Sequence, residues 1–363
     1  MQQILKGDKI LVAPLDWGLG HAARSIPIIQ RLLELGAEVI LAGDGMSFRF
    51  LRQAYPDLDA YELPSYQIEY PAGWGGAWKT VFKAPKIIRA IREEHQEVQK
   101  LVNNLGIGII LSDNRYGVYA SQIPSIFIGH QLRVLPPKGF RWASDVILAW
   151  HRQFLKHFDE IWVPDFPGQQ NLSGILSHGV KVGVPIRYIG PQSRFTGSSI
   201  LSGSPKENIV ALLSGPEPQR TILEDILTRQ LTELKLPAVL IRGVMDNEPI
   251  REIDNLKIIP YLHQKELQQV LESAKVVICR SGYSTLMDLM SFNTEMILIP
   301  TPGQTEQEYL AEELATKGVA VIQKQVKLNL RRALDQVHNT KSLPFLEQNW
   351  SLLDAGITYL KNK

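Results

Sequence analysis

The chain alternates between short, unbroken apolar runs and longer segments whose apolar residues recur every three or four positions. Runs such as 9–14, 107–111 and 276–279 have the pattern of buried strands, whereas 26–36 and 87–102 have the spacing of amphipathic helices. Strands that alternate with helices are typical of parallel sheets covered by helices. The pattern therefore predicts an α/β protein built from βαβ units.

One such unit, residues 274–314, carries polar residues suited to a ligand. The turn between its first strand and its helix consists of Arg280, Ser281 and Gly282. Gly282 lets the backbone approach closely, and the free amides at the start of the helix suit an anionic group such as a diphosphate. Further hydrogen-bonding side chains follow on the helix and after the second strand, namely Thr285, Asp288, Gln304, Gln307 and Glu308.

The same residues allow a purely structural interpretation. Ser284 or Thr285, followed by Asp288, has the pattern of a helix cap with a favourably placed acidic residue. A strand, a turn and a helix also occur in every α/β protein. Residue chemistry alone leaves both interpretations open.

A second glycine-rich turn follows the first strand of the chain. Its pattern is Gly-x-Gly-His-x-x-Arg, formed by Gly18, Gly20, His21 and Arg24. The third glycine of the dinucleotide fingerprint is absent. A histidine in the first helical turn would obstruct a pyrophosphate, which argues against a nicotinamide site. His21 is a candidate base and Arg24 a candidate anion partner, with a capping or packing histidine as the alternative.

Polar residues also follow two further strands of the first half. One strand is followed by Asp113, Asn114 and Arg115, and the next by His130 and Gln131. The carboxyl ends of parallel strands meet at one edge of a sheet, so these side chains should form a polar crevice with the glycine-rich turn. An acid and a histidine in such a crevice can share a proton. We therefore expect the catalytic base among His21, Asp113 and His130.

The strand pattern stops and restarts near the middle of the chain. Residues 190–208 are rich in Gly, Ser and Pro without periodicity, which predicts a linker at 196–207 between domains at 1–195 and 208–345. The strand that opens the second domain is followed by Ser214, Gly215 and Arg220, which offer amides and a cation to phosphate.

The segments CRSGYSTLMDL and PTPGQTEQEYLA resemble the donor-site signature of a glycosyltransferase family. The family is that of the inverting GT-B enzymes related to the one that adds N-acetylglucosamine to the peptidoglycan lipid intermediate. The resemblance implies two Rossmann-like domains facing each other across a cleft, with a closing helix at 346–363 that crosses back to the first domain. Donor would bind mainly to the second domain, and acceptor to the first.

The resemblance also implies roles for single residues. Arg280, Ser281 and Gly282 would lie near the diphosphate, and Asp288 would stand where the family has a glutamate on the ribose. The uracil and the donor sugar would be held by residues after other strands, namely Tyr261 and Leu262 for uracil and Gln307 and Glu308 for the sugar. The acceptor side would comprise Gly18, Gly20, Arg24, Asn114, Arg115 and Gln131.

The implied reaction is inverting transfer of a sugar from a UDP-sugar to a hydroxyl of a lipid-linked or cell-envelope glycan acceptor. Helix N-termini, Arg220 and Arg280 would offset the charge of the departing UDP without a metal or other cofactor. The Gly-x-Gly-His-x-x-Arg loop equally resembles that of nucleotide-sugar hydrolases of the same fold. A UDP-sugar hydrolase or epimerase, or a non-catalytic nucleotide-sugar-binding protein, is the alternative.

Length and composition narrow the function classes. The 363 residues exceed a single ordinary core, and 44% hydrophobic with 21% charged residues is typical of a soluble globular protein. A net charge of +2 argues against a nucleic-acid partner. The single cysteine, Cys279, excludes an internal disulfide, and Asp57-x-Asp59 lies in a polar segment unsuited to a metal. We expect a cytoplasmic protein without a signal peptide.

The most unusual surface segment is residues 71–92. It interleaves three aromatic residues, Trp74, Trp78 and Phe82, with five lysines and arginines and contains no acidic residue. This composition suits a bilayer interface with anionic lipid, at the inner face of the cell membrane. The alternative is a loop packed on the helix that follows it.

Overall fold

The computed structural model describes residues 5–66, 84–137, 139–140, 142–195, 208–244, 248–341, 343 and 350–361. The chain forms two compact units. The first comprises Met1–Arg194 and Asn349–Lys363, and the second comprises Phe195–Gln348. The linker predicted at 196–207 and the aromatic residues of 71–83 lie outside the described residues.

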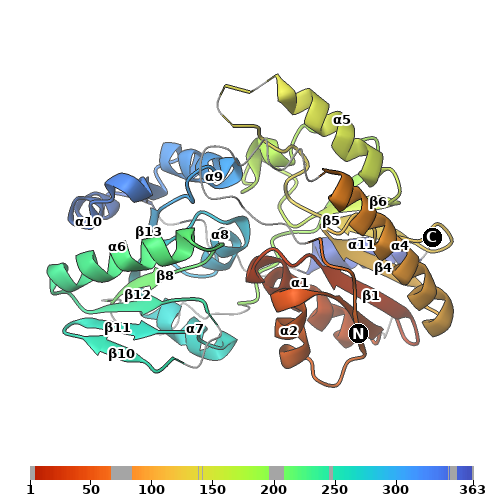
Figure 1. Cartoon of the computed structure of the whole chain (residues 1–363), viewed down its shortest axis with the longest axis horizontal. Coiled ribbons are helices and arrows are strands. Elements are labelled where there is room, and N and C mark those ends of the chain that lie inside the picture. Colours follow the sequence, from red (N-terminus) through yellow and green to blue (C-terminus); the bar gives the residue numbers. More distant parts are fainter. Residues whose placement is uncertain are drawn as a thin grey trace. The chain divides into compact units, whose positions relative to one another are not determined.

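The first unit is built on a seven-stranded sheet in the order β3-β2-β1-β4-β5-β6-β7, with every neighbouring pair parallel (Figure 1). We expected β6 to close this sheet, but β7 pairs outside it. β7 is short and half-buried, so it lacks the apolar run by which the other strands were recognised. The strands are β1 (Lys9–Pro14), β2 (Glu38–Gly43), β3 (Ala60–Glu62), β4 (Ile109–Asp113), β5 (Ser125–Ile128), β6 (Glu160–Val163) and β7 (Ile186–Tyr188).

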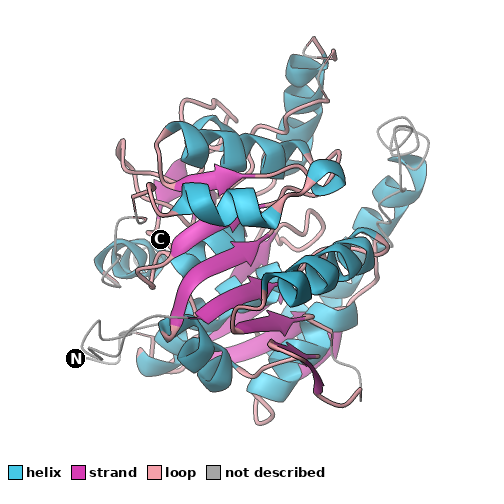
Figure 2. Ribbon diagram, turned by 90° about the vertical axis from the view of Figure 1, so that its left-hand side faces the viewer, coloured by secondary structure: helices cyan, strands magenta, loops and turns pink. Residues whose placement is uncertain are grey.

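Helices cover both faces of this sheet (Figure 2). On one face, Val98 of α4 packs with Ile110 of β4, and Leu155 of α5 packs with Phe127 of β5. On the other face, α11 approaches the ring of Trp162 in β6. The sequence therefore buries each strand from both sides, as a parallel sheet requires. The helices are α1 (Leu19–Glu34), α2 (Gly45–Ala54), α4 (Ala84–Leu105), α5 (Ala143–Leu155), α11 (Ser351–Lys361) and the short η1 (Gly174–Leu176).

The helix α11 at the end of the chain belongs to the first unit. Arg31 of α1 donates from Nε and Nη2 to the two carboxylate oxygens of Asp354, at 2.8 and 2.7 Å. The guanidinium of Arg187 lies 4.7 Å from the ring centre of Tyr359. At Gly356 an added Cβ would lie 3.0 Å from the ring of Trp162, so a glycine is needed for the helix to approach.

The second unit contains another seven-stranded sheet, in the order β10-β11-β9-β8-β12-β13-β14. Its pairs are parallel except for β10 with β11 at the edge. The strands are β8 (Asn208–Leu212), β9 (Ala238–Ile241), β10 (Arg251–Ile253), β11 (Leu256–Ile259), β12 (Ala274–Cys279), β13 (Glu295–Leu298) and β14 (Ala320–Ile322). The helices are α6 (Gln219–Leu234), α7 (Gln264–Glu272), α8 (Tyr283–Leu289), α9 (Thr305–Thr316), α10 (Leu330–Val337) and the short η2 (Gln325–Lys327).

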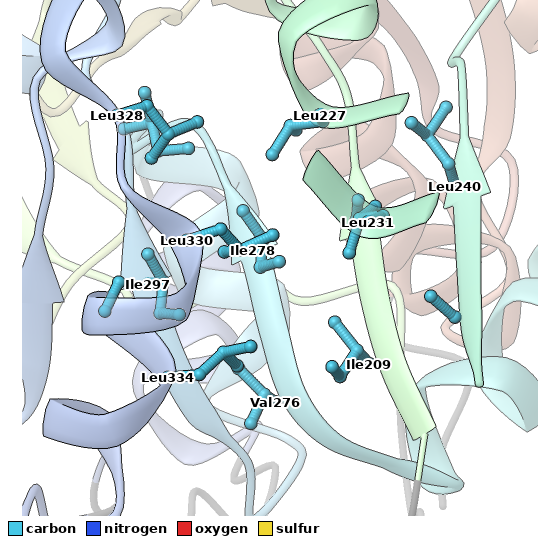
Figure 3. Packing of buried hydrophobic residues seen from close by; sticks show 14 of the residues in the cluster. Ile209, Leu227, Leu231, Leu240, Val276, Ile278, Ile297, Leu328, Leu330 and Leu334 are labelled. Atoms are coloured by element: carbon cyan, nitrogen blue, oxygen red, sulfur yellow. The ribbon is translucent and has the colours of Figure 1, made fainter. Parts of the chain in front are cut away.

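The core of the second unit lies between its sheet and two helices. Leu227 and Leu231 of α6 and Leu330 of α10 point over strands β8 and β12, where they meet side chains such as Ile278 (Figure 3). The predicted α/β fold is therefore confirmed. Among the described residues, no helix is long and apolar enough to cross a bilayer.

Candidate active site

Each sheet has one point at which the strand order reverses direction. In the first sheet it lies between β1 and β4, where Pro14 pairs with Asp113, and in the second between β8 and β12, where Leu212 pairs with Cys279. Ligands of open α/β sheets bind beyond the carboxyl ends of the strands at such a point. In the first sheet, the predicted residues 18–24 follow β1 and Asp113 ends β4, whereas in the second, Ser214 follows β8 and Arg280 follows β12.

Four buried side chains meet at the switch point of the first sheet. His21 Nδ1 lies 2.8 Å from Asp113 Oδ1. Arg24 donates from Nε to Asp113 Oδ2 at 2.6 Å and from Nη2 to Oδ1. Arg24 Nη1 also lies 2.8 Å from His130 Nδ1. The structure thus brings all three candidate catalytic residues into one hydrogen-bonded cluster with Arg24.

Local backbone geometry explains why these side chains converge. Gly18 has a φ of 74° where the chain leaves β1 and enters α1, a conformation that glycine adopts without strain. His21 and Arg24 are three residues apart on α1 and therefore lie on the same helix face. Asp113 is the last residue of β4, and His130 follows the end of the adjacent β5.

The cluster holds Asp113 ionised. Burial alone would raise the pKa of this carboxyl, but the charge of Arg24 and the hydrogen bonds from Arg24 and His21 hold it well below its usual range. Burial, with the charge of Arg24, lowers the pKa of His21 below 6.5, although Asp113 acts in the opposite direction. At neutral pH the pair is therefore a carboxylate beside a neutral imidazole.

The proton of the neutral imidazole can be assigned from its neighbours. An unprotonated Nδ1 would place its lone pair 2.8 Å from a carboxylate oxygen, which is repulsive. We therefore assign Nδ1–H as a donor to Asp113, the stronger acceptor. The contact of 2.9 Å between Nδ1 and Arg24 Nη2 is then a close approach rather than a hydrogen bond, because Nη2 donates to Asp113 Oδ1 instead. This leaves the Nε2 lone pair of His21 as the acceptor. His21 Nε2 makes no hydrogen bond to a described residue, and 11% of the side-chain surface stays exposed. This is the arrangement of a general base oriented by an acid.

Arg115 does not join the crevice predicted for it. Its side chain is fully buried and donates to Glu94 Oε1 and Asp44 Oδ1, each at 2.5 Å, and to the carbonyl oxygen of Pro64 at 2.8 Å. It also lies over the ring of Tyr66. In the structure the charge of Arg115 is used to hold α4 and two loops against the sheet, so its predicted contact with an acceptor stays a prediction.

The remaining acceptor-side residues lie around the cluster. Asn114 has a φ of 59°, and its Oδ1 would lie 3.2 Å from a Cβ added to Gly129, just before His130. Gln131 is half-buried beyond the same strand, and Gly20 lies in the first turn of α1. Their predicted contacts with an acceptor stay predictions.

At the switch point of the second sheet, the Arg280 side chain supports the surrounding backbone. The side chain is fully buried, and its Nη1 donates to the carbonyl oxygens of Ile299 and Pro300. Nη2 donates to the carbonyl oxygen of Gln219 at 2.8 Å and to Gln325 Oε1 at 2.6 Å. Burial lowers its pKa to about 10. These bonds join four segments, whereas Nε has no partner among the described residues, so the predicted contact of Arg280 with a diphosphate stays a prediction.

A hydrogen bond links the rest of the turn at 280–282 to α9. Ser281 Oγ donates to the carbonyl oxygen of Gln307 at 2.7 Å, and Gln307 Oε1 accepts from the amide of Thr301 at 2.9 Å. Gln307 Nε2 and Thr285 Oγ1 both lie near Gly282, at 4.0 and 3.9 Å from where its Cβ would be. A small open patch therefore remains at Gly282, bordered by an amide donor and a hydroxyl.

Thr301 is a site residue that sequence reasoning missed. It is 3% exposed, and its hydroxyl has no partner in the described part of the chain. Oγ1 lies 3.8 Å from the position of a Cβ on Gly215, whose φ of 104° opens the loop after β8. A buried hydroxyl without a partner at a switch point is a donor for a ligand. A single threonine after a strand gives no sequence signal of this kind.

Arg220 also pairs with side chains of the protein. Its Nε donates to Glu217 Oε1 and its Nη1 to Glu224 Oε2, both at 2.6 Å, and the residue is 7% exposed. Two carboxylates thus neutralise Arg220 in this structure, and its predicted contact with phosphate stays a prediction. Glutamates three residues before and four after an arginine are a sequence signal for such pairing.

The other predicted donor residues border the same edge of the second sheet. Asp288 lies on α8 and is 7% exposed, and Glu308 on α9 accepts a long hydrogen bond of 3.4 Å from the Gly303 amide. Those that are half-buried in loops or at a helix start are Ser214, Tyr261, Leu262 and Gln304. Within the described ranges, no group of three or more His, Cys, Asp or Glu is arranged to hold a metal ion.

Comparison with solved structures gives the fold. The MurG protein of Acinetobacter baumannii aligns over 98% of this chain and 99% of its own, with a TM-score of 0.58 and 15% identity. The glycosyltransferase SnogD from Streptomyces nogalater aligns over the same shares, with a TM-score of 0.60 and 16% identity. These likenesses show the GT-B fold.

The sequence of the second unit matches a known domain family. Residues 229–348 match the glycosyltransferase family 28 C-terminal domain, a range that includes the turn at Gly282. The chain is a glycosyltransferase of the GT-B fold, and its second unit is similar to the family 28 C-terminal domain. The resemblance noted in the sequence, and the fold it implied, are thereby confirmed.

Sequence relatives match different shares of the chain. An uncharacterized glycosyltransferase of Methanosarcina mazei is 24% identical over 327 residues, which are 85% of this chain and 84% of that protein. The UDP-N-acetylglucosamine–N-acetylmuramyl-(pentapeptide) pyrophosphoryl-undecaprenol N-acetylglucosamine transferase of Desulforudis audaxviator is 41% identical over 70 residues. These are 19% of this chain and 18% of the relative.

Proposed function

We propose that this glycosyltransferase moves a sugar, an N-acetylhexosamine or a hexose, from a UDP-sugar to a hydroxyl of a lipid-linked or cell-envelope glycan, with inversion. The observation that carries the proposal is the pairing of His21 with Asp113 at the switch point of the first sheet. A neutral imidazole with a free Nε2 is the base that an acceptor hydroxyl needs.

The proposed reaction is a direct displacement. Nε2 of His21 takes the proton of the acceptor hydroxyl as its oxygen forms a bond to the anomeric carbon of the donor. The bond from that carbon to the UDP oxygen breaks, and UDP leaves with the electron pair. Asp113 accepts Nδ1–H throughout and stabilises the imidazolium that forms.

The donor side rests on the second unit. In the proposal, the ribose lies at Asp288, and the diphosphate lies at the open patch near Gly282, with Gln307 Nε2 and Thr285 Oγ1 at its border. Arg280 acts through the carbonyl groups that it holds. Amide and hydroxyl donors placed where the leaving charge develops lower the barrier without a metal. Full activity in the presence of a metal chelator is the corresponding expectation.

Incubation with UDP-sugars tests the reaction class. We expect release of UDP that depends on an added membrane lipid extract, with a glycosylated lipid as the product. Release of UDP in buffer alone would instead support a UDP-sugar hydrolase, and binding without release would support a non-catalytic nucleotide-sugar-binding protein. Either result would overturn the transferase proposal.

Replacement of Asp288 by alanine should weaken UDP binding by about 1.5–3 kcal/mol, because a hydrogen bond to a charged group is lost. The measurement is a calorimetric titration with UDP. Asp225, an exposed aspartate on α6 of the same unit, provides the matched control, and its replacement by alanine should leave the affinity unchanged. Equal affinity in the wild type and a folded Asp288→Ala variant would refute the ribose contact.

The proposal of a lipid-linked acceptor draws support from the outer face of α5. Trp142, Val146 and Trp150 are spaced by four residues and are 71%, 63% and 43% exposed. The inner face is fixed, since His151 Nδ1 bonds to the Leu132 carbonyl oxygen at 3.0 Å and its Nε2 lies 2.9 Å from the Tyr116 hydroxyl. The helix therefore presents its tryptophans outward.

Charge favours anionic lipid as the occupant of this face. Residues 133–157 contain five lysines and arginines against one acidic residue, Asp145. Tryptophan with basic residues is the composition of a bilayer interface. The segment predicted for the same contact, 71–92, is described only from residue 84, and Lys86, Arg89 and Arg92 of α4 are exposed there. We propose that the enzyme works at the inner face of the membrane through both segments.

Binding to anionic vesicles should therefore depend on salt and on α5. Each cation near such a surface contributes about 1 kcal/mol, screened over roughly 10 Å at 0.1 M salt, so added salt should release part of the protein. A variant with Trp142→Ser, Val146→Ser and Trp150→Ser should lose most binding in a sedimentation assay. The control is Val326→Ser, at an apolar residue of the second unit that is 86% exposed. No sedimentation of the wild type at any salt concentration would exclude the membrane contact.

A further inference from the structure

The side chain of Arg24 is placed to control the protonation of the candidate base. It is 1% exposed, and its Nε and Nη2 grip both carboxylate oxygens of Asp113. Its Nη1 reaches His130 Nδ1 at 2.8 Å, and its Nη2 lies 2.9 Å from His21 Nδ1. The sequence predicted that Arg24 would bind an anion of the acceptor. In the structure, its guanidinium donates to the carboxylate of Asp113.

A buried carboxylate needs such a partner. Asp113 is 1% exposed, and an isolated carboxylate at this depth would take up a proton. A protonated Asp113 would become a donor and would no longer hold Nδ1–H of His21 in place. The two-point contact from Arg24 fixes both the charge and the orientation of the carboxylate.

Arg24 also acts on His21 directly through its charge. Three groups face the imidazole, namely Arg24 on the same helix, Asp113 at the end of β4 and His130 after β5. Asp113 attracts an imidazolium, whereas Arg24 repels it. With the cation in place, the attraction of the carboxylate is offset and the imidazole keeps its Nε2 lone pair at more acidic pH.

His130 completes the arrangement as an acceptor. Because a guanidinium only donates, His130 Nδ1 must carry the lone pair in this hydrogen bond. The Nδ1 lone pair of His130 is thus used by Arg24 Nη1. We therefore assign the role of base to His21.

We propose that Arg24 is the positioning residue of the His21–Asp113 pair: its guanidinium holds Asp113 as an anion that faces Nδ1 of His21, and its positive charge keeps His21 unprotonated. The role in turnover rests on the proposed function. The effect on His21 protonation does not, because it is a property of the protein without substrate.

The decisive experiment is an NMR titration of the His21 ring in the unliganded full chain. Replacement of Arg24 by glutamine should raise the midpoint of His21 protonation by about 1 pH unit or more. Without the guanidinium the buried pair takes up one proton, and an imidazole binds that proton more strongly than a carboxylate does. The matched control is Arg31→Gln. Arg31 is a buried arginine on the same helix whose partners are Glu34 and Asp354. An unchanged midpoint in a folded Arg24→Gln variant would overturn the proposal.

Arg24→Lys separates charge from geometry and serves also if the glutamine variant does not fold. It keeps the cation but loses the two-point grip, so the midpoint of His21 should stay low. Turnover should fall at least tenfold with KM nearly unchanged, because only the orientation of the base is lost. A midpoint raised above that of the wild type, or full turnover at every pH, would contradict the proposed role. The titration remains valid if the protein proves to catalyse another reaction.

Discussion

Replacement of His21 by alanine is expected to lower kcat by roughly a hundredfold to ten-thousandfold while UDP affinity stays nearly constant. General base assistance appears only in the transition state, so its loss affects turnover and not donor binding. The proposed donor residues belong to the other unit. The measurement pairs steady-state kinetics with a UDP titration of the same protein.

His157 provides the matched control for this prediction. It is an exposed histidine of the same unit that stacks on Tyr119, and His157→Ala should keep normal turnover. Asp113→Asn should also reduce turnover, since an amide cannot hold the imidazole as a carboxylate does. A His21→Ala variant with near-normal turnover would assign the base to Asp113 or His130 and remove the main support for the mechanism.

The convergence of the first cluster was predictable because it follows from topology. Asp113 and His130 end neighbouring parallel strands, and His21 and Arg24 lie one turn apart at the start of the first helix. The carboxyl ends of neighbouring parallel strands lie at the same edge of a sheet, whichever side chains they carry. Apolar runs also gave the central strands of both sheets. They failed for β7 and β10, which are three-residue strands without a buried core face.

The direction in which a side chain points was harder to predict than its position. Asp113 and Arg115 are two residues apart, yet the first faces His21 and the second faces Glu94. The deciding contacts come from residues far along the chain, on α4 and after β2. Arg280 is similar, since its partners Gln219 and Gln325 are distant in sequence. Only a local pair, such as Arg220 with Glu224, leaves a signal in the sequence itself.

Arg280 and Arg115 show a common use of buried cations in this fold. Each lies directly after a central strand and reaches sideways to loops that follow other strands. A guanidinium offers five donors in a rigid plane, so one side chain can satisfy several carbonyl or carboxylate groups that the sheet edge would otherwise leave buried. In both units the candidate ligand residues stand beside such a support.

The second large effect expected is on stability, from replacement of Arg115. Arg115→Leu should destabilise the first unit by about 3–5 kcal/mol, because Glu94 then remains as a buried charge without its partner. Burial already raises the pKa of Glu94 even with Arg115 present. Asp44 and the Pro64 carbonyl would lose their donor as well. Urea unfolding of the full chain, with hydrogen exchange of α4 and β4 peptides, measures the loss in this unit separately.

A double variant distinguishes this structural role from a role in acceptor binding. Arg115→Leu with Glu94→Gln removes both charges of the buried pair, so it should recover a substantial part of the lost stability. The opposite pattern is equally clear. If Arg115→Leu stays within about 1 kcal/mol of the wild type and its KM for the acceptor rises, Arg115 belongs to the acceptor site after all. The hydrogen bonds of Arg115 to Glu94, Asp44 and Pro64 would then exist only without acceptor, and the acceptor would replace them.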